Sequence, residues 1–264
     1  MEEESGELAV KGITADVPCD RYSDEGWLRT TVNVPDESEL TISVNGQEIV
    51  TILCTATKLN CLVIGFLYNE GVISSLRDVA SMRVCDEESL AEVRLNNVDF
   101  KLPALRKLSS GCGSGVTFLS EAKKVVSDLV VTPPEVLSLM KQLQDKMELY
   151  KLSGGIHTSA LADNKNLVVV TEDIGRHNTL DKIQGECLLR GISARDRILL
   201  TTGRVSSEMI LKAAKMQVPV VVSRTSPTGR SVSIARELDI ALVGYARANR
   251  LTVYSHPERF GHQS

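Results

Sequence analysis

The C-terminal half of the chain alternates short apolar runs with segments of helical periodicity, and no other feature restricts the possible folds so strongly. The apolar runs lie in "NLVVVTED", "RILLTTG", "VPVVVSRT" and "IALVGYAR", and segments such as "HNTLDKIQGECLLRG" and "SSEMILKAAKMQ" separate them. A strand that is apolar at consecutive positions is buried on both faces, as the strands of parallel sheets are. The pattern predicts an α/β domain with a mainly parallel sheet in three layers.

The first half of the chain predicts a smaller α+β unit. In "LTISVNGQEIVTILCTA" apolar and polar residues alternate around Asn45-Gly46, a pair that favours a tight hairpin turn. The segment "KLNCLVIGFLYNEG" has helical spacing and ends at Gly71, a residue suited to a helix C-cap. Short strands are expected near residues 82–85, 93–95 and 98–102.

These patterns divide the chain into four parts. We expect a disordered acidic start over residues 1–20, a small α+β domain over 21–108, a glycine-rich cysteine loop over 109–116 and a large α/β domain over 117–264. The large domain should begin with one helix in "TPPEVLSLMKQLQDKMELYKLSGG", capped by Thr132 and ended by Gly154.

Composition narrows the class of protein. Charged residues make up 24% of the chain and the net charge is -4, which argues against a nucleic-acid binder held by a basic surface. The acidic "MEEESGELAV" does not resemble a signal peptide, and no apolar run is long enough to span a membrane. We therefore expect a cytoplasmic protein whose six scattered cysteines remain thiols.

Three segments that follow predicted strands each carry an arginine. They are "TEDIGRHNT" with Arg176, "TTGRVSSE" with Arg204 and "SRTSPTGR" with Arg224. The carboxyl ends of parallel strands share one edge, where helix N-termini and guanidinium groups bind phosphate oxygens. The three loops together predict a phosphorylated, nucleotide-like ligand, although a single arginine in a surface loop is more often solvated or paired with a carboxylate. Neither a Walker A sequence nor a GxGxxG after a strand is present.

Two histidines, His157 in "GGIHTSA" and His177 in "GRHN", adjoin glycine-bearing turns of the same domain. Each could exchange a proton or hydrogen-bond a ligand, and helix capping is an equal alternative. The nearby acids Glu172, Asp173 and Asp181 could hold a metal or act as acid and base. Capping and salt bridges to Arg176 or Lys182 explain them equally well. No closely paired metal ligands occur, so no metal site is expected.

Cys112 in "SSGCGSG" lies between Gly111 and Gly113, which leave its sulfur unshielded by neighbouring side chains. A thiolate in such a loop is a strong nucleophile and could hold a sulfane sulfur as a persulfide, aided by Arg106 and Lys107. Composition alone favours the alternative, a flexible linker with an incidental cysteine.

A set of motifs between about Leu40 and Phe260 resembles the formate dehydrogenase accessory protein family, the FdhD sulfurtransferases. The motifs are "NEGVI", "GCGSG", "GGIHTSA", "EDIGRHNTLDK", "TTGRVSSEM", "VVVSRTSPT" and "GYARANRLTVYSHPERF". The resemblance implies a homodimer whose large domain is cytidine deaminase-like, with a smaller α+β N-terminal domain. It also implies sulfur transfer from a cysteine desulfurase to the molybdenum (or tungsten) bis-pterin guanine dinucleotide cofactor, needed by the formate dehydrogenase catalytic subunit.

Carried over by position, Cys112 matches the persulfide-forming cysteine of the family. The stretch assigned to the cofactor corresponds to Tyr245, Ala246, Arg247, Ala248, Asn249 and Arg250. The arginine-lined edge would suit the guanine nucleotide ends of that cofactor, which GDP or GMP could mimic. Many relatives carry a second loop cysteine where this chain has Gly115, so a relay through a second thiol is in doubt.

Two other functions remain open at this point. A non-enzymatic carrier could bind the cofactor and insert it into formate dehydrogenase without handling sulfur. A deaminase-like hydrolase would follow from the implied fold alone, and the zinc ligands that it requires are missing from the sequence.

Overall fold

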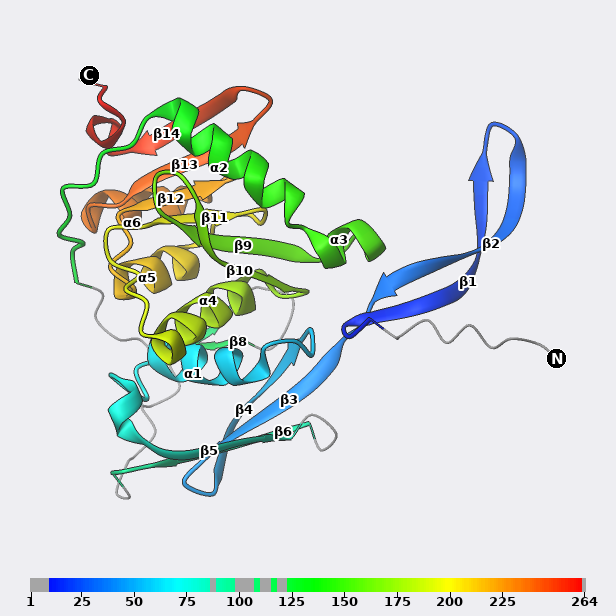
Figure 1. Cartoon of the computed structure of the whole chain (residues 1–264), viewed down its shortest axis with the longest axis horizontal. Coiled ribbons are helices and arrows are strands. Elements are labelled where there is room, and N and C mark those ends of the chain that lie inside the picture. Colours follow the sequence, from blue (N-terminus) through cyan, green and yellow to red (C-terminus); the bar gives the residue numbers. More distant parts are fainter. Residues whose placement is uncertain (1–9, 86–88, 98–106, 110–114, 118–122, 263–264) are drawn as a thin grey trace.

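The computed structural model describes residues 10–85, 89–97, 107–109, 115–117 and 123–262. In Figure 1 a two-part body carries one long hairpin that projects away from it. Cys112 and the strand expected over residues 98–102 lie outside the described residues.

The large domain is built on a six-stranded sheet with the order β10-β9-β11-β12-β13-β14. Its strands are β9 (His157–Ala162), β10 (Leu167–Asp173), β11 (Ile198–Thr201), β12 (Val220–Ser223), β13 (Ala241–Arg247) and β14 (Arg250–Ser255). β12 pairs parallel with β11 and with β13, whereas β9 runs antiparallel to β10 and β11, and β14 runs antiparallel to β13. The predicted mainly parallel sheet is therefore wrong, because β9 and β14 add antiparallel pairings that the apolar runs do not reveal.

The direction of the other strands still fixes one important edge. β10, β11, β12 and β13 all run the same way, so their carboxyl ends meet at a single edge of the sheet, where β9 begins. This edge is the place that the sequence predicts for the ligand-binding loops.

Helices cover both faces of this sheet (Figure 1). One face packs against α2 (Pro133–Asp145), and the other packs against α4 (Arg176–Arg190), α5 (Ser207–Lys215) and α6 (Gly229–Glu237). Leu139 and Leu143 of α2 share a core with Ala160 of β9, whereas Leu161, the next residue, packs with Ile183 of α4. Alternate strand residues thus bury opposite faces, and three layers result.

The helix expected to run to Gly154 is in fact two helices. Thr132 and Glu135 form a capping box at the start of α2, where the Thr132 N–H donates to the Glu135 carboxylate at 2.7 Å. The chain leaves helical geometry after Asp145, and α3 (Glu148–Ser153) follows. The Glu172 carboxylate of β10 accepts the N–H of Leu149 at 2.9 Å. A residue distant in sequence therefore caps the start of α3, where the sequence predicts one uninterrupted helix.

The small domain is a four-stranded sheet with one helix across it. Its elements are β3 (Ser38–Val44), β4 (Gln47–Cys54), β5 (Val79–Cys85), β6 (Leu90–Leu95) and α1 (Leu59–Asn69), in the sheet order β4-β3-β6-β5. Asn45 and Gly46 turn the β3–β4 hairpin with φ of 51° and 82°, as predicted. Short 3₁₀ turns occupy Leu76–Asp78 and Pro257–Phe260, and β7 (Lys107–Ser109) pairs with β8 (Gly115–Thr117).

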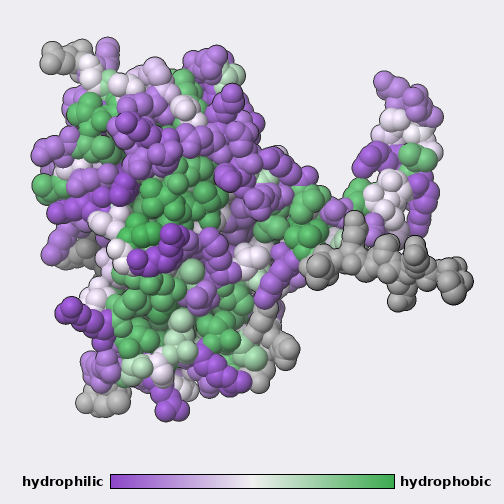
Figure 2. Space-filling model, viewed as in Figure 1, coloured by the Kyte–Doolittle hydropathy of each residue, from purple (hydrophilic) through white to green (hydrophobic). Residues whose placement is uncertain are grey.

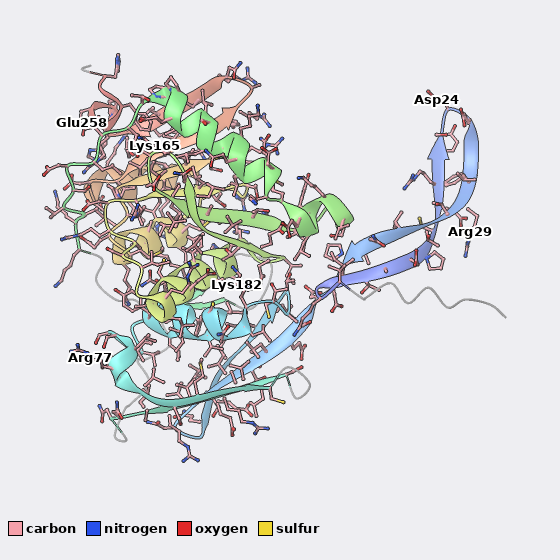
Figure 3. All side chains as sticks on the ribbon, viewed as in Figure 1. Asp24, Arg29, Arg77, Lys165, Lys182 and Glu258 are labelled. Atoms are coloured by element: carbon pink, nitrogen blue, oxygen red, sulfur yellow. The ribbon has the colours of Figure 1, made fainter. Side chains whose placement is uncertain are left out.

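The two domains meet through α1 and α4. A Cβ atom on Gly65 would collide with the backbone carbonyl of Asp181, and one on Gly185 would collide with that of Cys61. Only glycine permits two helix backbones to approach so closely. The buried ion pair between Lys182 and Asp173 lies beside this contact, where the Lys182 Nζ also donates to the Thr55 carbonyl at 3.0 Å (Figure 3). The predicted small and large domains therefore share a tightly packed interface.

The projecting hairpin consists of β1 (Ile13–Ser23) and β2 (Gly26–Pro35). The prediction of disorder over residues 1–20 is wrong for residues 13–20, which form β1. These residues pair along their length with β2, from Ile13 opposite Pro35 to Ser23 opposite Gly26. The acidic composition of the first residues obscured the short alternating pattern that follows them.

Candidate functional site

Three of the predicted site residues gather at the carboxyl edge of the large sheet. His157 begins β9, and Arg176 and His177 begin α4 directly after β10. Gly203, which follows β11, lies against two of them: a Cβ at Gly203 would stand 3.1 Å from the Arg176 Cβ and 3.2 Å from the His157 Nδ1. The absence of a side chain at Gly203 therefore allows the ends of β9, β10 and β11 to come together.

His177 is held in place by α5. Its Nε2 lies 2.9 Å from the Ser206 Oγ and 3.8 Å from a Glu208 carboxylate oxygen. Burial lowers the pKa of His177 to about 4, although the charge of Glu208 opposes that shift. The pKa of His157 is also lowered, first by burial and then by the Arg176 charge. Both imidazoles are therefore neutral at pH 7 and act as hydrogen-bonding groups rather than as cations.

A buried network of hydroxyl groups fixes the loops of this edge. The Ser159 Oγ lies 2.7 Å from the Thr179 Oγ1 and donates to the Thr201 Oγ1 at 3.0 Å. The Thr179 hydroxyl donates to the Arg176 carbonyl, and the Gly203 N–H donates to the Thr201 Oγ1. Sequence reasoning missed these hydroxyls. The serine and threonines that adjoin the histidine and arginine motifs are the only local signal for them.

The loops that carry Arg204 and Arg224 lie side by side along the same edge. The Val205 N–H donates to the Ser226 carbonyl at 3.2 Å, and the Arg224 N–H donates to the Thr201 carbonyl at 3.0 Å. The Arg204 side chain is exposed and that of Arg224 is half-buried. The three arginine loops thus share one edge, and Arg176 is the arginine that, like His157, lies against Gly203.

The segment Tyr245 to Arg250 forms the end of β13, a tight turn and the first residue of β14. Ala248 and Asn249 have φ of 49° and 60°, and they turn the chain so that Arg247 pairs with Arg250. The Tyr245 N–H donates to the Thr225 carbonyl at 3.0 Å, and the Arg247 guanidinium lies 5.9 Å from the Tyr245 ring centre. The turn is therefore anchored to the loop that follows β12.

A cavity of about 630 Å³ lies between this turn and α2. It is lined by Pro134, Leu137, Ser138, Met140, Lys141 and Gln144 of α2 and by Ala246, Arg247, Ala248 and Asn249 of the turn. Because α2 and α4 cover opposite faces of the sheet, the predicted cofactor residues form two groups, one at His157, Arg176 and His177 and one at the turn. Sequence reasoning missed Lys141 and Gln144, whose proximity to the turn depends on tertiary packing.

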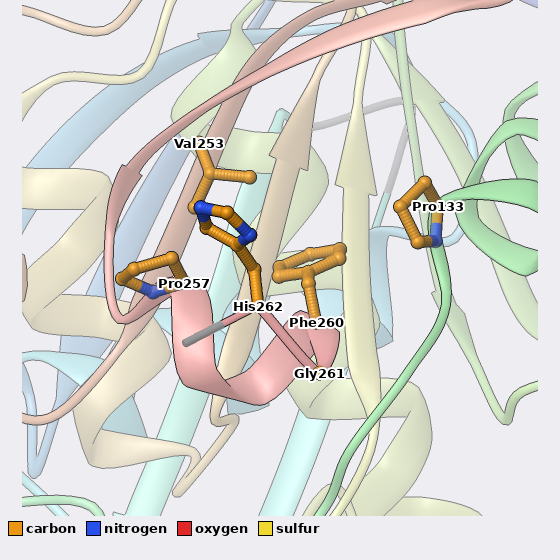
Figure 4. A pocket seen from close by; sticks show the side chains of 6 residues that line it. All are labelled: Pro133, Val253, Pro257, Phe260, Gly261 and His262. Carbon is orange, nitrogen blue, oxygen red and sulfur yellow. The ribbon is translucent and has the colours of Figure 1, made fainter. Parts of the chain in front are cut away.

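A second cavity, of about 610 Å³, lies at the C-terminal end of the described chain (Figure 4). Its lining is mostly apolar and consists of Pro133, Val253, Pro257, Phe260, Gly261 and His262. None of these residues is among the predicted site residues.

The acidic residues considered as metal ligands or acid and base have structural partners. The Asp173 Oδ2 lies 2.6 Å from the Lys182 Nζ in a fully buried pair, and Glu172 caps α3. Asp181 pairs with Lys212 at 2.7 Å rather than with Arg176 or Lys182, and burial raises its pKa against the effect of the Lys212 charge. Within the described ranges, no group of three His, Cys, Asp or Glu side chains could hold a metal ion.

The cysteine loop is bounded by the short pair β7 and β8, in which Ser109 lies opposite Gly115. Cys112 falls between these strands and outside the described residues. Its role therefore stays a prediction.

Comparison with known proteins decides the family. The model of the FdhD/NarQ family matches residues 35–261. The chain belongs to the FdhD/NarQ family. Two relatives called sulfur carrier protein FdhD, from Staphylococcus aureus strains Newman and COL, are each 38% identical to it over 94% of this chain and 97% of their own length.

A solved structure of the same class has a similar fold. It is described as a formate dehydrogenase accessory protein from Desulfotalea psychrophila and is 26% identical, with a TM-score of 0.79. The match covers 94% of this chain and 99% of that one, so both domains share the family's fold. In the part of the chain that the structure describes, no helix has the length and apolar character needed to cross a membrane.

Proposed function

We propose that this protein is a sulfurtransferase that accepts sulfur from a cysteine desulfurase as a Cys112 persulfide. It passes that sulfur to the molybdenum (or tungsten) bis-pterin guanine dinucleotide cofactor needed for formate dehydrogenase activity. Membership of a family whose relatives are called sulfur carriers is the observation that carries the proposal.

The chemistry needs one thiolate. The Cys112 sulfur attacks the terminal sulfur of a persulfide on the desulfurase, so that a new S–S bond forms on Cys112 and the desulfurase leaves as a thiolate. On delivery, Cys112 keeps the electron pair of the broken S–S bond. The terminal sulfur departs in the zero-valent state, and the receiving metal centre supplies the two electrons that reduce it to sulfide. Gly115 in place of a second cysteine is compatible with both steps.

The residues at the carboxyl edge suit the guanine nucleotide ends of this substrate. Arg176, Arg247 and Arg250 offer guanidinium groups for phosphate oxygens. The neutral imidazoles of His157 and His177 offer hydrogen bonds without adding charge. Arg204 and Arg224 lie on loops of the same edge. GDP or GMP would therefore bind as mimics of the nucleotide ends.

The proposed function also implies a fold for the large domain, an oligomeric state and two protein partners. The arrangement of α2, the sheet and three helices supports a cytidine deaminase-like large domain. We infer a cytoplasmic homodimer that meets two proteins in turn, the cysteine desulfurase and the catalytic subunit of formate dehydrogenase.

Persulfide loading tests the function directly. The purified protein is incubated with a cysteine desulfurase and cysteine, and its intact mass is measured. The wild type should gain the mass of one sulfur atom, which a reducing agent removes, and Cys112→Ala should gain none. Cys19→Ala is the matched control, because Cys19 lies on the projecting hairpin, and it should load normally. A wild type that stays unlabelled, or a Cys112→Ala variant that labels equally, would refute the proposal.

A second candidate is a non-enzymatic chaperone that binds the cofactor and inserts it into formate dehydrogenase. Gly115 favours it, because the second loop thiol of many relatives is missing. Complementation separates the two: cells that lack the native protein receive Cys112→Ser. Full formate dehydrogenase activity would support the chaperone, and lost activity with unchanged GDP binding would support the sulfurtransferase.

A further inference from the structure

The hairpin Ile13–Pro35, called the arm below, forms a two-stranded sheet of its own. It projects clear of the body, and the side chains of Asp24 and Arg29 mark its outer part in Figure 3. A two-stranded hairpin without a hydrophobic partner is marginally stable in water. The arm therefore needs a surface to cover it.

The two faces of the arm differ in chemistry. One face carries Val17 opposite Val32, then Cys19 opposite Thr30, and nearer the tip Leu28 opposite Arg21; the exposed fraction of Leu28 is 63%. This alternation is typical of a strand pair with one buried face. The apolar face is thus built for burial, and the chain's own body does not reach it at Leu28.

The opposite face of the arm is polar along most of its length and aromatic at the tip. Asp20 and Arg29 form a cross-strand ion pair at 3.1 Å, with both side chains exposed. Tyr22 and Trp27 stack at the tip with ring centres 5.1 Å apart, and they are 68% and 75% exposed. Large exposed aromatic side chains of this kind are enriched at protein interfaces.

We infer that the arm joins two copies of this chain: its apolar face packs on the arm of the second copy, and the aromatic side chains of its tip contact α3 of that copy. The inference rests on the proposed homodimer and names its surface. Tyr150 and Leu152 of α3 are 44% and 46% exposed. They lie near the base of the arm, where Figure 2 shows hydrophobic residues gathered and where Pro35 adjoins Gly155.

A two-fold axis makes this arrangement self-complementary. If the axis crosses the middle of the paired arms, the tip of each arm arrives at the base of the other, beside the partner copy's α3. Each copy then gives an arm and receives one, which is the pattern of an isologous interface. No second kind of surface is needed.

The arms supply only part of the area that a stable dimer needs. An 11-residue strand is about 36 Å long, and a two-stranded ribbon is roughly 10 Å wide. Two arms packed on each other therefore bury about 700 Å², whereas specific interfaces bury roughly 1,200–2,000 Å². The contacts of the two tips with α3 supply the remaining area.

Sedimentation velocity and light scattering test the arm. The wild type should be a dimer at micromolar concentration, and Leu28→Asp should raise its dissociation constant by at least about 100-fold, because a charge replaces a leucine that the proposed interface buries. Val126→Asp is the matched control, since Val126 is 73% exposed on the body, and it should leave the dimer intact. Circular dichroism checks that each variant is folded.

Photo-cross-linking locates the contact. A photoreactive phenylalanine analogue replaces Trp27 in a mixture of ¹⁴N- and ¹⁵N-labelled protein. Mixed-isotope products on the α3 peptide support the arm, and products confined to single-isotope chains overturn it. A wild-type monomer overturns the homodimer and the arm together, whereas a dimer that survives Leu28→Asp overturns only the arm. Persulfide loading on Cys112 is measured separately and is independent of either result.

Discussion

The buried ion pair between Lys182 and Asp173 is the interaction whose loss should cost the most stability. Both side chains are fully buried, with the Lys182 Nζ 2.6 Å from the Asp173 Oδ2. The same ammonium donates to the carbonyls of Thr55 in the small domain and Glu172 in β10. Lys182→Met keeps the length of the side chain and removes the charge and every donor, so it tests the pair without a large cavity.

The expected cost is about 3–5 kcal/mol of the free energy of unfolding. Removing one partner of a buried pair leaves an uncompensated charge, which costs about this much. Asp173 would keep three donors, since the Thr55 N–H, the Gly175 N–H and the Asn178 side chain all donate to it. Those bonds place the cost near the lower end of the range, about 3 kcal/mol.

Urea denaturation followed by far-UV circular dichroism measures this cost. Tryptophan fluorescence is unsuitable because the single tryptophan, Trp27, lies at the tip of the arm. Lys124→Met is the matched control: its ion pair with Asp239 is 3.4 Å long and largely exposed, so its loss should cost at most about 1 kcal/mol. If both variants lose about 1 kcal/mol or less, the reasoning about the buried pair is wrong.

Two further predictions concern the carboxyl edge. Gly203→Val should weaken GDP binding at least about tenfold in calorimetry, because its side chain would press on Arg176 and His157, whereas Gly229→Ala, which has open space, should bind normally. His177 has its folded pKa depressed to about 4, so the unfolded chain binds a proton more readily between pH 6.5 and 4, and stability falls as pH drops through that window. His177→Asn should flatten this part of the stability curve, and an unchanged slope in urea titrations at several pH values would contradict the assignment.

The elements between residues 167 and 247 follow from local sequence. Apolar runs of three or more residues predict β10, β11, β12 and β13, and segments of helical periodicity predict the helices between them. The cap residue Thr132 and the turn pair Asn45-Gly46 were equally local and were confirmed. These features depend only on interactions between residues that are close in the sequence, so they can be predicted from the sequence alone.

Elements that depend on distant partners were not predicted. β9 and β14 contain polar residues and run antiparallel, and their pairing depends on which strands lie beside them. The break before α3 depends on Glu172, which caps α3 from another element. The sequence predicts disorder over residues 1–20, whereas residues 13–20 belong to β1, because their two-residue alternation forms a strand only through pairing with β2.

The features of the candidate site also fall into those that local sequence predicts and those that depend on distant residues. The order of strands and loops determined from sequence alone that Arg176, Arg204 and Arg224 follow strand ends, and family motifs singled out Cys112 and the turn at Tyr245 to Arg250. Only the tertiary structure decided that His157 meets Arg176 across Gly203, that Ser206 and Glu208 hold His177, and that Lys212 rather than Lys182 pairs with Asp181. The physical reason is that backbone direction is encoded by short-range hydrophobic patterns, whereas side-chain contacts arise between residues that only the packed sheet and helices bring together.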